Sequence, residues 1–294
     1  MTAPRKLPVV LIHGLWLNRD SWQTWVERYR AAGHEVLAPG WPGMDASVAE
    51  LNRDPSPMND VGVGEVVDSY EKILDTLDQE PVLMGHSFGG AVVQVLLSRG
   101  RGAAGVAIHP APIKGVLRLP VAALRSASPV LRNPANRHKT VALTPEQWHY
   151  SFCNTLSREE SDELYRRFAV PTPGRPLFQA ATANFDPHAA TKVDYRKPDR
   201  APLLLIGSDK TDHTVPGSIV RETKAHYHSG LVELKEYPGR PHFTGGTPGW
   251  EAVADYALEW ATRVAPAHPA PRSAVPKPRP AEEAAPKDEP TPTA

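Results

Sequence analysis

The stretch that decides the fold of this chain is Pro81-Val82-Leu83-Met84-Gly85-His86-Ser87-Phe88-Gly89-Gly90. It begins as a short apolar run that is bounded by proline and too short for a helix, and it leads into a helix-compatible segment at 91–97. A strand, a sharp turn and a helix around Gly-x-Ser-x-Gly form a nucleophile elbow, which exposes a serine hydroxyl on a strained turn. The flanking glycines let helix and strands approach closely. Ser87 is therefore the candidate nucleophile.

Strands and helices alternate on both sides of this stretch. Besides the elbow strand, strands are predicted at 7–12, 35–38, 105–108, 201–207 and 232–237, and helices at about 22–29, 63–77, 217–228 and 250–262. Continuous aliphatic and β-branched runs are typical of parallel strands that are covered on both faces. The alternation predicts an α/β fold in which a mostly parallel central sheet carries helices on both faces.

The alternation is lost between Pro112 and Pro198, where short helices are predicted at 144–152 and 157–168 between Pro- and Arg-rich links. Long loops without a function are uncommon, so we expect a helical cap inserted at about 112–199 over the carboxyl edge of the sheet. The predicted domain covers residues 1–264. Residues 265–294 are rich in proline and alanine and are predicted to be disordered, because they cannot bury enough apolar surface.

Composition limits the partners of the protein. Lys and Arg together number 33 and balance 33 Asp and Glu, so no net charge favours nucleic acid or a membrane surface, and we expect neither as a partner. The single cysteine, Cys153, excludes an intrachain disulfide framework. No secretory signal pattern is visible, and no apolar run approaches the roughly 20 residues that span a bilayer. A cytoplasmic location and a small-molecule substrate are predicted; the sequence does not constrain the oligomeric state.

A serine hydroxyl needs a base to take its proton and an acid to orient that base. His242 lies in a Pro- and Gly-rich turn just after the last predicted strand, and Asp209 and Asp212 follow the strand at 201–207. The chain order of serine, acid and histidine fits an elbow nucleophile. His242 is therefore the candidate base, and either aspartate is a candidate acid.

Taken together, these motifs resemble those of the α/β-hydrolase superfamily. The matching segments lie between residues 7 and 264 and are His13-Gly14, the elbow, Asp212-His213-Thr214-Val215-Pro216, and His242 followed by Gly249-Trp250. The resemblance implies a catalytic triad of Ser87, Asp212 and His242. It favours Asp212 because this residue directly precedes the Thr-Val-Pro turn, and Asp209 stays the alternative acid.

The resemblance also implies an oxyanion hole, which stabilises the negative charge of a tetrahedral intermediate. Its expected donors are the backbone N–H groups of Leu15 and Phe88, and Trp16 is expected to wall the substrate pocket. This mechanism requires no metal ion. No Gly-x-Gly-x-x-Gly follows the first strand, so no dinucleotide or other cofactor is expected.

The function implied by the resemblance is that of a serine hydrolase, which cleaves a carboxylic ester of a small or medium-sized substrate through an acyl-enzyme. Alternatives on the same architecture are a cofactor-free perhydrolase or haloperoxidase, in which peroxide intercepts the acyl-enzyme, and a thioester or lactone hydrolase. A non-enzymatic alternative is a ligand-binding protein that retains a hydrolase shell. Haloalkane dehalogenation and epoxide opening by this fold use an elbow aspartate, and serine at position 87 excludes them.

Overall fold

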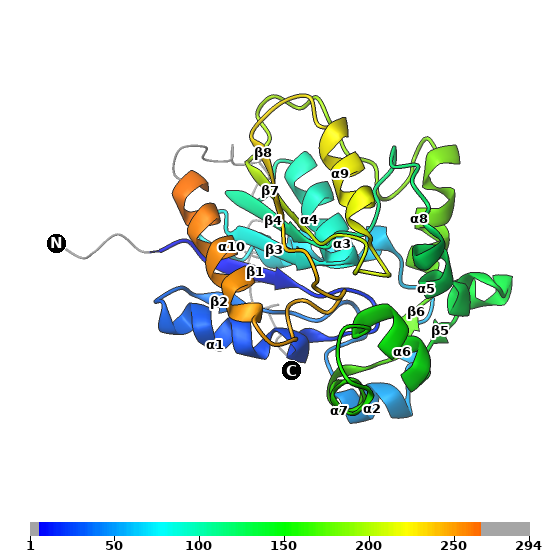
Figure 1. Cartoon of the computed structure of the whole chain (residues 1–294). Helices are drawn as coiled ribbons and strands as arrows, with labels where there is room; N and C mark the ends of the chain where they lie inside the picture. The colour runs from blue at the N-terminus through cyan, green and yellow to red at the C-terminus, as the bar shows by residue number, and fades with distance from the viewer. Residues whose placement is uncertain (1–5, 266–294) are drawn as a thin grey trace, which may run out of the picture.

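The computed structural model describes residues 6–265, which are built around a six-stranded sheet (Figure 1). The strands are β1 (Val9–Ile12), β2 (Val36–Leu37), β3 (Val82–His86), β4 (Ala104–Ile108), β7 (Leu203–Gly207) and β8 (Val232–Glu236). Their order is β2-β1-β3-β4-β7-β8, and every neighbouring pair is parallel. The predicted parallel sheet is confirmed, and the elbow strand β3 lies inside it.

Helices cover both faces of this sheet. One face carries α1 (Gln23–Ala31) and α10 (Trp250–Val264), and the other carries α3 (Val63–Leu74), α4 (Phe88–Ser98) and α9 (Gly217–His226). Side chains alternate along β1, so that Val9 and Leu11 join one apolar cluster whereas Val10 and Ile12 join the other. All four are fully buried, which explains why this strand is apolar throughout.

The chain between β4 and β7 forms a separate layer beside the sheet edge (Figure 1). It contains α5 (Val121–Leu131), α6 (Pro145–Phe152), α7 (Arg158–Phe168), α8 (Arg175–Thr182) and an antiparallel pair, β5 (Thr140–Val141) and β6 (Thr172–Pro173). The two helices predicted from sequence, α6 and α7, are present, and Thr144 and Ser157 cap them through capping boxes. We refer to residues 112–199 as the cap.

Several elements were not predicted from the sequence. Pro129 lies inside α5, where proline usually indicates a break, and α8 has a proline in its first turn but no side chain that caps its start. Helix α2 (Val48–Arg53) was not among the predicted helices, although the capping box of Ser47 and Glu50 marks its start. Short 3-10 helices cover Arg19–Trp22, Ser56–Met58, Pro134–His138 and Ala183–Phe185.

Two glycines allow the elbow to form. Ser87 has φ 56° and ψ −120°, a backbone conformation that residues other than glycine rarely adopt. A Cβ atom at Gly85 would collide with the carbonyl oxygen of Gly89, and one at Gly89 would collide with that of Ile12. The strained turn therefore depends on the missing side chains at both positions.

Within residues 6–265 no helix is long and apolar enough to cross a membrane. The tail that the sequence predicts to be disordered lies outside the described residues apart from Ala265.

We expect Gly89→Ala to lower the free energy of unfolding by about 3 kcal/mol, because the added methyl group forces β1 and α4 apart. Urea denaturation measures this change. Gly64→Ala in α3 is the matched control, because no atom lies within 4 Å of the added methyl group. The free energy of unfolding of this variant should be unchanged or higher by up to about 1 kcal/mol. Equal losses in the two variants would contradict the packing argument.

Candidate active site

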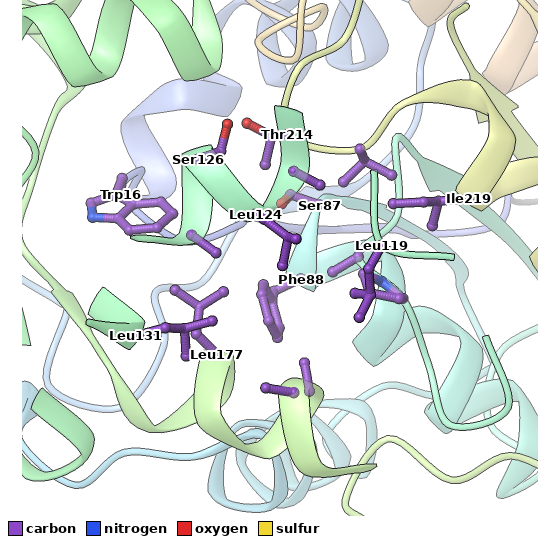
Figure 2. A pocket seen from close by; sticks show the side chains of 17 residues that line it. Trp16, Ser87, Phe88, Leu119, Leu124, Ser126, Leu131, Leu177, Thr214 and Ile219 are labelled. Carbon is purple, nitrogen blue, oxygen red and sulfur yellow. The ribbon is translucent and has the colours of Figure 1, made fainter. Parts of the chain in front are cut away.

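The elbow holds Ser87 between two strand ends. The Ser87 N–H donates to the carbonyl of Ile108 at 2.9 Å, and the Ser87 carbonyl accepts from the N–H groups of Gly90 and Ala111, each at 2.9 Å. These bonds tie the turn to the end of β4 and to the residue that precedes the cap. The Ser87 side chain faces a cavity (Figure 2), so its hydroxyl is presented to a bound ligand.

The second predicted component is a buried pair of Asp212 and His242. Both side chains are fully buried, and His242 Nδ1 donates to Asp212 Oδ2 at 2.9 Å. Asp212 Oδ1 accepts from the N–H groups of Thr214 at 2.8 Å and Val215 at 2.7 Å. Burial alone would raise the pKa of Asp212, but His242 and His109 outweigh it and hold this pKa well below its ordinary value. Asp212 is therefore an ionised acceptor that fixes the orientation of His242.

His86 connects the His242 loop to the elbow. Its ring centroid lies 4.7 Å from that of His242, and His86 Nε2 donates to the carbonyl of His242 at 2.8 Å. Burial lowers the pKa of His86 well below its ordinary value, so the imidazole is neutral. Because His86 immediately precedes Ser87, this bond sets the base loop against the nucleophile.

The nucleophile and the base do not share a hydrogen bond in this structure. His242 Nε2 is buried and has no hydrogen-bond partner among the described residues. Phe152 of α6 packs edge-on against the His242 ring at a centroid distance of 5.1 Å. Nucleophile–base contacts are often long before substrate binds and tighten in the complex. His242 therefore engages Asp212 through Nδ1 and keeps Nε2 without a hydrogen bond among the described residues.

His109 is a site residue whose partner the sequence did not identify. It directly follows β4 at φ 45°, and its Nδ1 donates to Asp212 Oδ2 at 2.6 Å, so two imidazoles share one carboxylate oxygen. Burial lowers the pKa of His109 despite the neighbouring carboxylate, so it is a neutral donor. In the sequence His109 directly follows the strand predicted at 105–108, and this position alone does not indicate its partner.

Among residues 6–265, the only group of side chains that could supply three metal ligands consists of His109, Asp212 and His242. Their donor atoms lie within 4.8 Å of one another. The two Nδ1–H donors on Asp212 Oδ2 already account for their contacts. A cation bound there would have to displace these hydrogen bonds. The metal-free site expected from the sequence remains a prediction.

Asp209, the alternative acid, occupies a different position. Its Oδ1 accepts from the N–H groups of Thr211 at 2.9 Å and Gly239 at 3.4 Å, and from the Ser208 hydroxyl at 3.3 Å. The Thr211 hydrogen bonds are the main reason that the pKa of Asp209 falls to about 2. Asp209 thus stabilises its own loop, and Asp212 is the aspartate that contacts His242.

The loop after β1 packs directly on the nucleophile. A Cβ atom at Gly14 would lie 2.7 Å from Ser87 Cβ. His13 holds the loop: its Nδ1 donates to the carbonyl of Gly14 at 2.9 Å, and its Nε2 accepts from the N–H of Trp41 at 3.2 Å. Burial lowers the pKa of His13 to about 4, which keeps this acceptor unprotonated.

The two predicted oxyanion donors belong to this loop and to the elbow helix. Leu15 is buried in the loop, one residue beyond Gly14. Phe88 is the first residue of α4, where a backbone N–H has no acceptor within the helix. Both N–H groups remain candidates for the oxyanion hole. Trp16 lines the cavity, as expected for a pocket wall.

The cavity over Ser87 is apolar and has a volume of about 150 Å³. No charged side chain lines it, and its only hydroxyls belong to Ser87, Ser126 and Thr214 (Figure 2). The cap contributes mainly leucines and alanines from α5 and α8, such as Leu124 and Leu177. The cap therefore forms one apolar wall of the pocket.

Trp16 joins the cap to the sheet. Its indole Nε1 donates to the carbonyl of Val141 at 3.0 Å, and its own carbonyl accepts from the N–H of Val170 at 3.2 Å. Trp16 has φ 60°. Because both bonds reach β5 and the link after α7, the pocket wall is held to the cap at two points.

Comparison with known proteins identifies the family to which this architecture is similar. The sequence profile of the alpha/beta hydrolase family matches residues 9–255. Among solved structures, a monoacylglycerol lipase from Paleococcus ferrophilus is 20% identical with a TM-score of 0.60, over 88% of this chain and 96% of that chain. An extracellular alpha/beta-hydrolase from a Paenibacillus species is 23% identical with a TM-score of 0.63, over 86% and 98% of the two chains. A methylesterase from Arabidopsis is 13% identical with a TM-score of 0.60, over 87% and 99%. No curated protein matches the sequence.

We expect Asp212→Asn to lower the free energy of unfolding at neutral pH by about 3 kcal/mol, because buried donors lose a charged acceptor. The pKa of Asp212 is depressed in the folded state. Its stabilisation is therefore complete above the pKa of an unfolded aspartate, about 3.9, and is lost as the pH falls below it. Urea denaturation at several pH values should show the gap between wild type and variant shrinking below about pH 4.

Asp209→Asn is the control for this experiment. The amide oxygen of asparagine can still accept from the loop N–H groups that Asp209 contacts, and the side chain is only partly buried. We expect a loss of less than about 1 kcal/mol. A loss at neutral pH as large as that of Asp212→Asn would contradict the special role assigned to the buried carboxylate.

Proposed function

This chain belongs to the alpha/beta hydrolase family, and we propose that it is a serine esterase that cleaves neutral carboxylic esters through an acyl-enzyme. One observation carries the proposal: the elbow presents the Ser87 hydroxyl to an apolar cavity, and the Asp212–His242 pair lies beside the same elbow. Two of the similar solved structures are a monoacylglycerol lipase and a methylesterase, which supports an ester as the substrate.

The proposed reaction begins with attack of Ser87 Oγ on the acyl carbon. His242 accepts the Ser87 proton at Nε2, because Nδ1 is engaged with Asp212, and then donates it to the leaving alcohol. The ionised Asp212 stabilises the imidazolium that forms in between. The Leu15 and Phe88 N–H groups are proposed to receive the oxyanion, a contribution of about 10²- to 10³-fold in rate for one such donor. Water activated by His242 then releases the acid.

The pocket argues for a neutral substrate. A carboxylate or ammonium group inside it would lose its hydration and find no charged partner among the lining residues. An acyl group of modest length would instead bury its methylenes against Leu124, Leu177 and Ile219. Perhydrolysis and thioester or lactone hydrolysis pass through the same acyl-enzyme, and they differ from this proposal in the acyl donor or the acyl acceptor.

A fluorophosphonate probe tests the nucleophile. The wild-type protein should be labelled at Ser87 and should turn over p-nitrophenyl butyrate many times, whereas Ser87→Ala should do neither. His242→Ala should fold but label at least about 10²-fold more slowly, because the hydroxyl loses its base. Labelling of Ser87→Ala at the wild-type rate, or a single turnover followed by a stall, would overturn the proposal.

A series of p-nitrophenyl esters tests the pocket. We expect kcat/KM to rise about fourfold for each methylene from acetate to roughly hexanoate, as buried methylenes contribute about 0.8 kcal/mol each, and then to level off as the cavity fills. The matched pair is the pentanoate ester and the glutarate monoester, which has the same chain length and a terminal carboxylate. The glutarate ester should react at least about 100-fold more slowly. Equal rates for the pair would contradict the neutral-substrate assignment.

A further inference from the structure

Exposed apolar side chains gather on one part of the cap. Among residues 6–265, the large hydrophobic side chains that are strongly exposed are Leu117 (69%), Leu119 (64%), Val121 (81%), Leu124 (46%) and Phe185 (89%). We call these five residues the mouth patch. Four of them lie within residues 117–124. Exposed apolar surface that gathers in one place usually marks an interaction site.

Hydrogen bonds hold the fifth residue close to the other four. Asn184, which precedes Phe185, accepts from the N–H of Gly115 at 2.7 Å and donates to the carbonyl of Val116 at 2.9 Å. The segment that carries Phe185 is thus fixed to the segment that leads into Leu117. The mouth patch is therefore one local surface built from two separate stretches of the cap.

The mouth patch is continuous with the cavity over Ser87. Leu119 and Leu124 are exposed, and both also line the cavity (Figure 2). A molecule that covers this patch would therefore contact the rim of the pocket. The patch lies where an apolar substrate would enter.

The charge of the same part of the cap is one-sided. Residues 112–145 contain Lys114, Arg118, Arg125, Arg132, Arg137 and Lys139 but no Asp or Glu, although the whole chain is balanced. On α5 the exposed positions are Val121, Leu124, Arg125 and Ser128, and Arg132 continues this face at the helix end. One face of the helix therefore combines apolar and cationic side chains.

Neighbouring acids neutralise this charge only in part. Glu222 lies 3.8 Å from Arg118, and Asp60 pairs with His138. Asp186 is exposed beside Phe185. Within the part of the chain that the structure describes, no ion pair involves Arg132, Arg137 or Lys139, which are all exposed. The cap thus keeps positive charge that forms no ion pair among the described residues, and Arg132 lies at the end of the same helix that carries Val121 and Leu124.

We propose that the mouth patch and the basic side chains of residues 112–145 dock this protein on an anionic lipid surface, with the pocket mouth facing the membrane. An interface that combines apolar anchors and Lys or Arg side chains binds such surfaces, at about fivefold in affinity for each basic residue near the lipid. A second copy of the chain is a less suitable partner for the mouth patch. A symmetric contact would bring residues 112–145 of both copies together, and these segments are basic and contain no Asp or Glu. The expectation of no membrane partner came from the net charge of the whole chain, whereas this proposal rests on the local charge of residues 112–145.

Docking of this kind goes beyond ester cleavage and does not depend on it. A neutral, apolar ester dissolves in a bilayer, so a pocket that opens onto the lipid would receive substrate without a passage through water. Binding can be measured with the Ser87→Ala protein as well as with the wild type. A failure of the esterase proposal would leave the binding result unchanged, and the two can be distinguished.

Co-sedimentation with vesicles tests the proposal. The full chain should bind vesicles of phosphatidylcholine and phosphatidylserine, bind phosphatidylcholine alone at least about tenfold more weakly, and lose affinity as salt is added. Arg132→Gln and Arg137→Gln should each weaken binding about fivefold. Val121→Ser and Phe185→Ser should each weaken it about tenfold. Arg263→Gln is the matched control, since Arg263 is exposed on α10, away from the cap (Figure 1), and it should bind like the wild type.

Three results would overturn the proposal. The first is no binding to either vesicle. The second is equal binding to both vesicles with no effect of the arginine variants beyond that of Arg263→Gln. The third is a dimer in sedimentation velocity without lipid that Val121→Ser and Phe185→Ser convert to a monomer, which would assign the patch to a second copy of the chain. Unchanged thermal unfolding of the surface variants shows that their effects do not arise from misfolding.

Discussion

The buried carboxylate of Asp212 is the interaction on which the arrangement of the site depends. It accepts hydrogen bonds from two imidazoles and two backbone N–H groups, and these donors come from the ends of three neighbouring strands. A carboxylate without these partners would not stay ionised in such surroundings. The charge and its donors therefore require each other. The His242 ring is oriented by this group, while His86 holds the backbone of the buried loop that carries it.

Strain is concentrated at the same edge of the sheet. Trp16, Ser87 and His109 have positive φ values, and they follow β1, β3 and β4, which are adjacent in the sheet. Such conformations cost about 1–3 kcal/mol each and persist only where the surroundings hold them. Here the surroundings are the closely packed glycines, the hydrogen bonds of the elbow and the buried acid. The fold thus gives up some stability to hold the segments that carry Trp16, Ser87 and His109 at one edge of the sheet.

The cap lines the cavity over Ser87 and therefore influences which molecules can reach this residue. It is held by Trp16 at the wall of the pocket and by Phe152 against the His242 ring, so that the pocket and the base share the same cover. The inner side of the cap is lined by leucines and alanines, and its outer side carries the mouth patch together with Arg132 and Arg137, which form no ion pair within residues 6–265. A single insertion thus links the proposed preference for neutral esters to the proposed docking on lipid.

The sequence by itself determined the parallel sheet, the covering helices, the capped cap helices and the elbow, because each leaves a local pattern of apolar spacing, capping residues or glycines. It did not show whether Asp209 or Asp212 contacts His242, and it did not identify the partner of His109. Only the tertiary structure decided these points, since the contacts join residues 30 and 103 positions apart. The lining of the pocket was also decided there. Periodicity shows which face of an element is buried, but not which element lies opposite, because that depends on how strands and crossovers pack in three dimensions.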